Sequence, residues 1–382
     1  MKQKVEMIGL PRMIILFIFM VVSCFLIAGT VATFTKEIVY SGSVGSTIEA
    51  LPTELFSQIF EMENHYLGEE TSTDNSIISM GIEFITNIRI HDIRTLIGNE
   101  LPGYTLYDTE IVVPGDGTNF ASLPYESAPP LDVLLQEREM AKEELEEFNR
   151  GRDSTDSPVG PPSEKSVYIY HSHSWESFLP LLGLSGDPDE NKAVDAKTNI
   201  TLVGDLLGKE LEIRGVGALV DKTNIAQHLK LNGWGTGKSY DVSRTIIEDA
   251  LSSHKSLQYF IDIHRDSQRG DMTTATIDGK TYARIAFVLG KENKNYEKNF
   301  AFANELHESL KEKYPGISRG IIAKYGEGVN GVYNQDLSPN LIVVEVGGVD
   351  NDMKELKNSV GALADVIGDY YWKAERVNGT EE

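Results

Sequence analysis

The sequence predicts an α/β protein: a doubly wound, mixed sheet with helices on both faces, preceded by one transmembrane helix and a mostly helical spacer. Two observations predict the sheet. From residue 166 onward, short apolar strands alternate with amphipathic helices, which is the order that a doubly wound sheet requires. Three of the strands also end in residues that bind metals or transfer protons, and α/β proteins place their active sites at the carboxyl ends of their strands.

The N-terminal segment is a nearly uncharged apolar run from Met13 to Phe34, long enough to cross a membrane once at about 20 residues. Lys2, Lys4 and Arg12 precede it and hold the N-terminus in the cytoplasm, so the chain after about residue 35 is expected to be exported. A cleaved signal peptide is an alternative, but its apolar region is usually only roughly 7–15 residues long. Cys24 resembles a lipid-attachment site, yet the apolar run continues past it, which favours an uncleaved anchor.

The composition limits the chemistry of the exported part. Cys24 is the only cysteine of the 382 residues, so a metal site outside the anchor must use histidines and carboxylates. Lys plus Arg total 35 against 58 Asp plus Glu, a net charge of −23. Because nucleic-acid binding depends on neutralising phosphates, this charge excludes a general nucleic-acid binder.

The region between the anchor and the sheet is expected to be a spacer. It contains a possible extended segment at Tyr104–Val113 and an acidic helix at Leu131–Phe148, read as solvated. Glycine, serine, aspartate and three prolines then mark a linker. The predicted segments are a cytoplasmic N-terminus at 1–12, the anchor at 13–34, the extracytoplasmic spacer at 35–148, the linker at 149–165, a catalytic domain at 166–376 and a tail at 377–382.

Within the catalytic domain, strands are predicted from short apolar runs and helices from longer amphipathic ones. The predicted strands are 167–171, 215–220, 257–263, 284–289, 317–323 and 341–346. The predicted helices are 199–213, 242–251, 296–314 and 353–372.

Histidines and glutamates end three of these strands. The first strand runs into His173 and Glu176, the third is followed by His264, and the last contains Glu345. An H-x-x-E pair with a distant histidine supplies the three protein ligands of a catalytic zinc ion, whose fourth position is left for water. The sequence therefore predicts a mononuclear zinc hydrolase with Glu345 as the general base.

Two of the ligands have competitors. His171 lies two residues before His173, and on an extended chain both side chains point to the same side, so His171 is an alternative ligand or a substrate contact. Asp195 precedes the first helix by about one turn and is an alternative to Glu176. The remaining histidines are interpreted as surface residues: His65, His91, His228, His254 and His307.

A glycine-rich segment, Asn232–Lys238, matches neither phosphate-loop pattern, because its glycines stand at other spacings. We expect a loop at the rim of the site, with Trp234 offering a flat face to a sugar or peptide. Tyr240 and Arg244 follow as substrate-binding candidates, and Arg244 suits a carboxylate unless it pairs within its own helix. Arg265, beside the third ligand, is a further candidate.

At these motifs the chain resembles the stage II sporulation protein P family, membrane-anchored cell-wall hydrolases of endospore-forming bacteria. The resemblance covers about residues 165–375. Its carriers are YHSHSWES at Tyr170–Ser177, SYDVSR at Ser239–Arg244, DIHRDS at Asp262–Ser267 and VEVGG at Val344–Gly348.

That family resembles the zinc-dependent N-acetylmuramoyl-L-alanine amidases, in which His, Glu and His hold the metal and a late Glu is catalytic. The resemblance implies these roles for His173, Glu176, His264 and Glu345, a zinc amidase-like domain, and peptidoglycan as the substrate. It also implies endopeptidase activity on cross-links, and partnership with stage II sporulation proteins D and M while the forespore is engulfed.

Two other classes stay open. The same ligand pattern describes zinc carboxypeptidases, which would cut a peptide terminus. A non-catalytic scaffold would keep the fold without the chemistry, although four intact site residues argue against it. The sequence shows no wall-binding repeat, so localisation is expected to depend on the membrane anchor and on partners.

Overall fold

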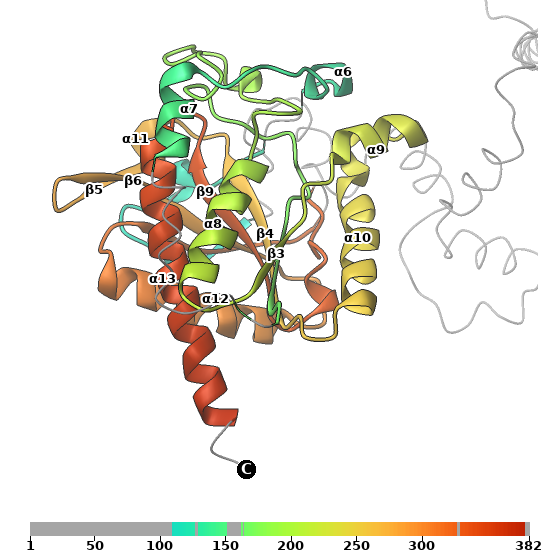
Figure 1. The fold of residues 1–382 in the computed structure, drawn as a ribbon, viewed down its shortest axis with the longest axis vertical. Helices are drawn as coiled ribbons and strands as arrows, with labels where there is room; N and C mark the ends of the chain where they lie inside the picture. Colours follow the sequence, from blue (N-terminus) through green and yellow to red (C-terminus); the bar gives the residue numbers. More distant parts are fainter. Residues whose placement is uncertain (1–108, 127–128, 151–161, 163, 327–328, 379–382) are drawn as a thin grey trace, which may run out of the picture. The chain divides into compact units, whose positions relative to one another are not determined.

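The structure, a computed structural model, describes residues 109–126, 129–150, 162, 164–326 and 329–378 (Figure 1). In these ranges, no helix combines the length and the apolarity needed to cross a membrane. The predicted anchor at Met13–Phe34 and most of the predicted spacer lie outside the described residues, as do residues 151–161 of the predicted linker.

A seven-stranded mixed sheet forms the centre, in the order β1-β8-β7-β9-β4-β2-β3. Its strands are β1 (Thr109–Pro114), β2 (Val167–Tyr170), β3 (Ala218–Val220), β4 (Tyr259–Asp266), β7 (Ile285–Gly290), β8 (Ser318–Lys324) and β9 (Leu341–Gly348). β3, β2, β4 and β9 are parallel, β7 and β8 run the opposite way, and β1 pairs antiparallel with β8. The predicted mixed α/β sheet is confirmed.

Helices cover both faces of this sheet. α8, α12 and α13 share one apolar cluster with it, and α8 and α13 lie side by side in Figure 1, while α10 packs on the opposite face. The helices are α6 (Leu131–Leu134), α7 (Lys142–Asn149), α8 (Thr201–Ile213), α9 (Ile225–Asn232), α10 (Ser239–Ser253), α11 (Gly270–Thr273), α12 (Tyr296–Lys313) and α13 (Met353–Asn378). The smaller elements are a hairpin of β5 (Thr274–Ile277) and β6 (Lys280–Ala283) and the 3-10 turns η2 (Phe120–Ser122), η3 (Glu190–Lys192), η4 (Thr236–Lys238) and η5 (Gln335–Leu337).

The alternation of side chains along β4 decides where the polar residues project. Successive residues of a strand face opposite sides of the sheet. Ile261 and Ile263 pack in the cluster under α8, α12 and α13, whereas Phe260 packs with α10. Asp262 and His264 lie two and four residues after Phe260, so their side chains project from the same face of the sheet, the one covered by α10.

Residues 109–149 belong to the same unit as the sheet, which corrects the prediction of a solvated spacer ending at 148. β1 extends the sheet, and Phe148 of α7 is buried in the main core. Glu144 of α7 accepts a hydrogen bond of 2.7 Å from the backbone N–H of Met353, which satisfies one of the open donors at the start of α13. The predicted single helix at 131–148 is two helices, α6 and α7, and Leu134 and Phe148 are buried in separate clusters.

The elements predicted downstream of residue 166 agree with the observed ones to within a few residues, but α9, the short helix α11 and the β5–β6 hairpin were not predicted. The interpretation of His307 as a surface residue is wrong, because this residue of α12 is buried. Its Nδ1 atom lies 2.7 Å from Ser318 Oγ at the start of β8.

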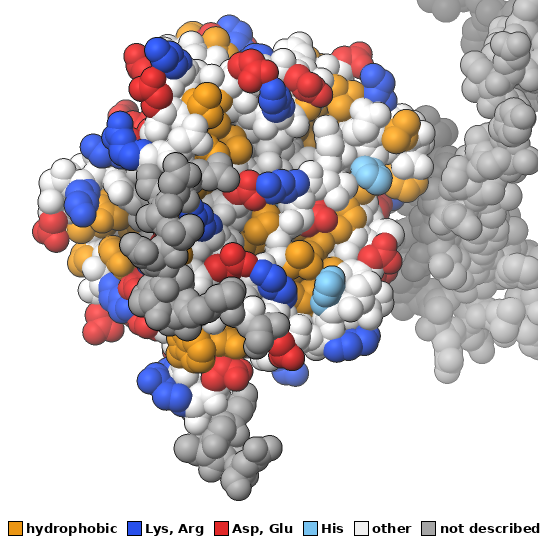
Figure 2. All heavy atoms as spheres, in the orientation of Figure 1, with side chains coloured by type: hydrophobic (Ala, Val, Ile, Leu, Met, Phe, Trp, Pro, Cys, Tyr) orange, Lys and Arg blue, Asp and Glu red, His pale blue; other side chains and the backbone are white. Residues whose placement is uncertain are grey.

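The surface over α12 and α13 carries mixed charge. Figure 2 shows acidic and basic side chains interspersed on the face seen in Figure 1. Ion pairs join the two helices: Lys313 of α12 pairs with Asp365 and Asp369 of α13, and Glu305 of α12 pairs with Lys373 of α13. Because such exposed pairs contribute only about 0–1 kcal/mol, α12 and α13 are held mainly by the apolar cluster beneath them.

Candidate metal centre

His173 and Glu176 come from the turn that follows β2. The backbone N–H of Glu176 donates a hydrogen bond of 3.0 Å to the carbonyl of His173. This turn brings the two side chains together, with His173 Nδ1 at 3.3 Å from Glu176 Oε1. Both residues are buried.

His264 reaches the same place from β4. Its Nδ1 lies 3.5 Å from Glu176 Oε2, and its Nε2 lies 3.0 Å from Asp262 Oδ1. Asp262 is itself fixed, because it accepts hydrogen bonds from the backbone N–H of Ser172 at 2.8 Å and from Ser172 Oγ at 2.5 Å. A carboxylate at the far nitrogen of a ligand histidine fixes the orientation of the ring and raises its basicity.

His173, Glu176 and His264 together could hold a metal ion. Their ligand atoms lie within 4.8 Å of one another, and all three residues are buried. Nδ1 of His264, the nitrogen that faces Glu176, has no aligned hydrogen-bond partner among the described residues, although buried polar groups are normally hydrogen-bonded. Two imidazoles and one carboxylate are a known ligand set of catalytic zinc.

The charges within this group support the same assignment. Burial alone would lower the pKa of His264, but the carboxylates of Asp262 and Glu176 outweigh it and raise that pKa well above its usual range. Burial alone would raise the pKa of Glu176, but His264 and His173 outweigh it and hold that pKa well below its usual range. The group therefore favours positive charge at its centre, which a bound metal ion would supply in place of the imidazolium proton.

Glu345 of β9 stands opposite His264 in the parallel pairing of β4 with β9. It is 2% exposed, and its Oε2 atom has no hydrogen-bond partner in the part of the chain that the structure describes. Burial raises the pKa of Glu345 to about 8, with His264 opposing and Glu176 adding to the shift. A carboxyl group with a pKa near neutrality is suited to accept a proton and return it.

Tyr240, in the first turn of α10, lies against both histidines. Its ring is stacked on that of His264 with centroids 6.2 Å apart, and it meets His173 at 5.4 Å. Tyr333 touches Tyr240 edge-on at 5.2 Å. Tyr333 and Asn334 both have left-handed backbones, and the Asn334 side chain donates a hydrogen bond to the Tyr240 carbonyl. Such strain is often stored at functional sites, and here it fixes a predicted substrate-binding residue beside the metal group.

Glu126 and Lys324 also lie at the centre, and neither was predicted from the sequence. Glu126 Oε2 is 3.6 Å from His173 Nδ1, and its Oε1 is 3.7 Å from Lys324 Nζ. Lys324 could have been identified as a candidate, because it is a charged residue at the end of the apolar strand β8. Glu126 had no such signal, because it lies in an irregular segment that was assigned to the spacer.

Two predicted substrate-binding arginines are engaged elsewhere. Arg244 donates two hydrogen bonds of 2.8 Å to Asp336 and lies 3.2 Å from Glu248 of its own helix. Arg265 corrects the sequence interpretation, because its side chain is 1% exposed and donates to the backbone carbonyls of Ser177 and Ala193.

Arg265 nevertheless positions Glu176, a candidate metal ligand, through its main chain. Its backbone N–H donates a hydrogen bond of 2.9 Å to Glu176 Oε2.

His171 and Asp195 are not part of the metal group. His171 Nδ1 lies 3.1 Å from the carbonyl of Ile263, and its ring packs against Gly204 of α8. It therefore lies on the α8 side of the sheet, and the expectation that it points the same way as His173 is wrong because the chain turns after β2. Asp195 accepts hydrogen bonds from the backbone N–H groups of Lys197 and Thr198, which makes it a turn residue.

The glycine-rich segment is a loop between α9 and α10, as expected. Gly233 ends α9 with a left-handed backbone, φ 66°, a conformation that glycine adopts without strain. Trp234 follows and is 43% exposed. Its contact with a sugar or peptide stays a prediction.

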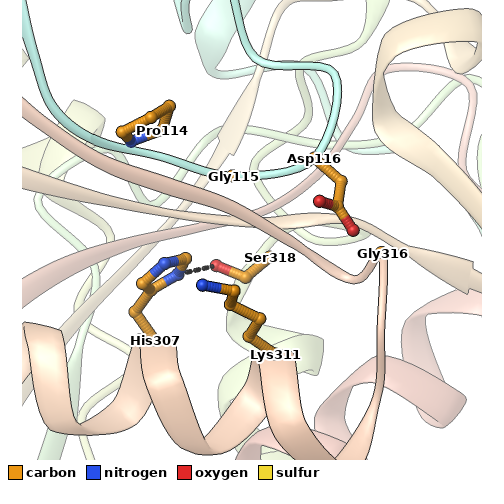
Figure 3. Close-up of a pocket in the computed structure, with 7 residues that line it drawn as sticks. All are labelled: Pro114, Gly115, Asp116, His307, Lys311, Gly316 and Ser318. Atoms are coloured by element: carbon orange, nitrogen blue, oxygen red, sulfur yellow. Dashed lines mark hydrogen bonds between the residues drawn. The ribbon is translucent and has the colours of Figure 1, made fainter.

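A separate pocket lies between α12 and the start of β8 (Figure 3). His307 and Ser318 line it and are hydrogen-bonded to each other, and Lys311 reaches in from α12. Its cavity of about 10 Å³ has room for about one water molecule. None of the metal-group residues lines this pocket, so it is not the candidate functional site.

A family model and a curated relative both indicate one family. Residues 91–368 match the family described as stage II sporulation protein P. The chain is 44% identical over 374 residues to "Stage II sporulation protein P" of Bacillus subtilis (strain 168), covering 96% of this chain and 93% of that protein. Among solved structures it is similar to "Cwp6 from Clostridium difficile", with 18% identity, a TM-score of 0.32, and coverage of 54% of this chain and 29% of that one.

Proposed function

The chain belongs to the stage II sporulation protein P family, and from this membership together with the metal centre we propose that it is a zinc-dependent peptidoglycan hydrolase. The proposed reaction is hydrolysis of the amide between the lactyl group of N-acetylmuramic acid and L-alanine, with endopeptidase activity on peptide cross-links. The observation that supports it most is the buried His173–Glu176–His264 group with Glu345 opposite it in the sheet.

The site residues divide the chemistry among them. A zinc ion held by His173, Glu176 and His264 would polarise the scissile carbonyl and increase the acidity of water. Glu345 takes the proton from the attacking water and passes it to the leaving nitrogen of alanine, which yields a free lactyl carboxylate and a free amine. Tyr240 shields the group from bulk water by covering both histidines.

The biological setting is part of the same proposal. The family name places the chain among sporulation proteins. We propose that Met13–Phe34 anchors it in the cytoplasmic membrane with the catalytic domain outside, next to the wall. Its action would then be septal wall degradation during engulfment of the forespore, together with stage II sporulation proteins D and M.

The test combines metal analysis with digestion of purified sacculi. The full-length protein in detergent should bind one zinc per chain and release peptides with a free N-terminal alanine, identified by mass spectrometry. His264→Ala should lose zinc and activity. Glu345→Gln should keep zinc and fold but lose about 10²-fold or more in rate, since glutamine cannot carry the proton. Release of single terminal amino acids would instead indicate a carboxypeptidase, and an active, zinc-free His264→Ala protein would refute the metal assignment.

A further inference from the structure

Lys324 is a buried cation on the sheet face that carries the metal centre. It is the last residue of β8, and only 8% of its side chain is exposed. Its ammonium lies 3.7 Å from Glu126 Oε1, which is an ion-pair distance but too long for a hydrogen bond. Among the described residues the ammonium has this ion pair but no hydrogen bond of ordinary length, so a closer anionic partner can still bind it.

Glu126 is the group that now faces this cation. Its other oxygen lies 3.6 Å from Nδ1 of the metal ligand His173, so a single carboxylate spans the space between Lys324 and the metal group. The Glu126 side chain is 32% exposed. It can therefore turn into water at little cost, and an incoming anion can occupy its place between Lys324 and His173.

The other charged groups near the centre do not offer this function. Glu176, Asp262 and Glu345 are carboxylates and repel an anion. Arg319 is a nearby cation, but it donates a hydrogen bond of 2.6 Å to Asp266 and is 1% exposed. The partner of Lys324, in contrast, is the partly exposed Glu126, which an incoming anion can displace.

We propose that Lys324 binds a carboxylate of the substrate close to the scissile amide, taking the place of Glu126. The inference rests on the proposed function, and it narrows the substrate to stem peptides with a free acidic group near the bond that is cut, such as the α-carboxylate of the glutamate that follows L-alanine. Lys324 would then form direct charge-assisted hydrogen bonds of ordinary length with that carboxylate. Glu126 keeps the cation paired while no substrate is bound.

The test uses two disaccharide peptides that differ in one group: the α-carboxyl of the second residue is free in one and a carboxamide in the other. Binding is measured by calorimetry to zinc-loaded full-length Glu345→Gln protein, so that turnover does not interfere, and kcat and KM are measured with otherwise unaltered protein. We expect the free acid to be preferred about 10- to 100-fold, the range of one hydrogen bond to a charged group. Lys324→Met should abolish this preference through KM and the binding constant, with kcat changed little.

Two further variants separate recognition from folding. Glu126→Gln should retain the preference and tighten binding of the free acid, because the competing carboxylate is gone. Lys324→Met/Glu126→Gln removes both charges, which restores charge balance if the single variant folds poorly, and it should bind both peptides equally. Lys291→Met, at an exposed pair with Glu110, is the matched control and should behave as wild type.

The outcomes distinguish this inference from the proposed function. If the Lys324→Met/Glu126→Gln protein holds zinc, unfolds normally and still prefers the free acid, Lys324 does not recognise the substrate. Equal binding of both peptides by the parent Glu345→Gln protein would overturn the inference in the same way. If the peptides bind with the expected preference but wild-type protein cuts neither, the inference stands and the proposed reaction fails.

Discussion

Gly204 of α8 leaves the space that the ring of His171 occupies. A Cβ added there would lie 2.4 Å from His171 Nε2 and 2.7 Å from Cε1. The ring cannot retreat easily, because it is 3% exposed and its Nδ1 lies 3.1 Å from the carbonyl of Ile263. We therefore predict that Gly204→Ala destabilises the protein.

The magnitude follows from two opposing terms. Alanine gains about 1 kcal/mol over glycine in a helix interior, while overpacking of a filled core costs about 1–3 kcal/mol. The short contact with a constrained ring puts the cost near the upper end, so we expect a net loss of about 1–2 kcal/mol. For a domain of this size that lowers the unfolding midpoint by about 2–8 °C.

Gly361 of α13 provides a matched control. A Cβ added there has no atom within 4 Å, so Gly361→Ala gains the helical preference without a clash and should raise the midpoint by about 1–4 °C. Thermal unfolding followed by circular dichroism, with metal removed by chelator, measures both variants. The reasoning is refuted if Gly204→Ala is as stable as Gly361→Ala, or if His171→Ala fails to relieve the effect of Gly204→Ala in the double variant.

Three more outcomes are expected. Asp262→Asn should lower zinc affinity about 10- to 100-fold, the usual effect of losing the carboxylate behind a ligand histidine; competition with a zinc-binding dye measures it, and unchanged affinity would remove Asp262 from the site. Burial lowers the pKa of His307, so below about pH 6.5 the unfolded chain binds more protons than the native one and stability falls with the pH. His307→Gln should flatten this fall in urea unfolding between pH 7 and 5, and an equally steep fall would contradict the assignment. Protease added to intact protoplasts should digest the exported chain and leave a small fragment containing Met13–Phe34, whereas full protection would reverse the topology.

The sequence was most informative where a residue's environment depends on its own strand. β4 and β9 are continuous apolar runs, so their polar residues His264 and Glu345 stood out, and parallel strands of one sheet place such residues together. The turn holding His173 and Glu176 is equally local. For these reasons the metal group could be predicted before any contact between distant parts of the chain was known.

Contacts between distant parts could not be predicted. Arg244 had a partner on its own helix, Glu248, but its closer contact is Asp336, which lies far along the chain. α7 is polar along most of its length, so nothing local showed that Phe148 is buried or that Glu144 caps α13. Glu126 reaches the metal group by the same kind of contact. Each of these contacts depends on tertiary packing, which composition and periodicity do not predict.

The pairing of β1 with β8 affects what a cut in the chain would do. A protease that cleaved within residues 151–161 would break the covalent path between the anchor and β2, but the N-terminal piece would still hold β8 through β1 and the core through Phe148. If Met13–Phe34 anchors the chain as proposed, nicking there would not release the sheet domain from the membrane. A recombinant fragment that began after the linker would lack β1. The edge of β8 would then be unpaired and could template aggregation. A soluble fragment should therefore begin before Thr109.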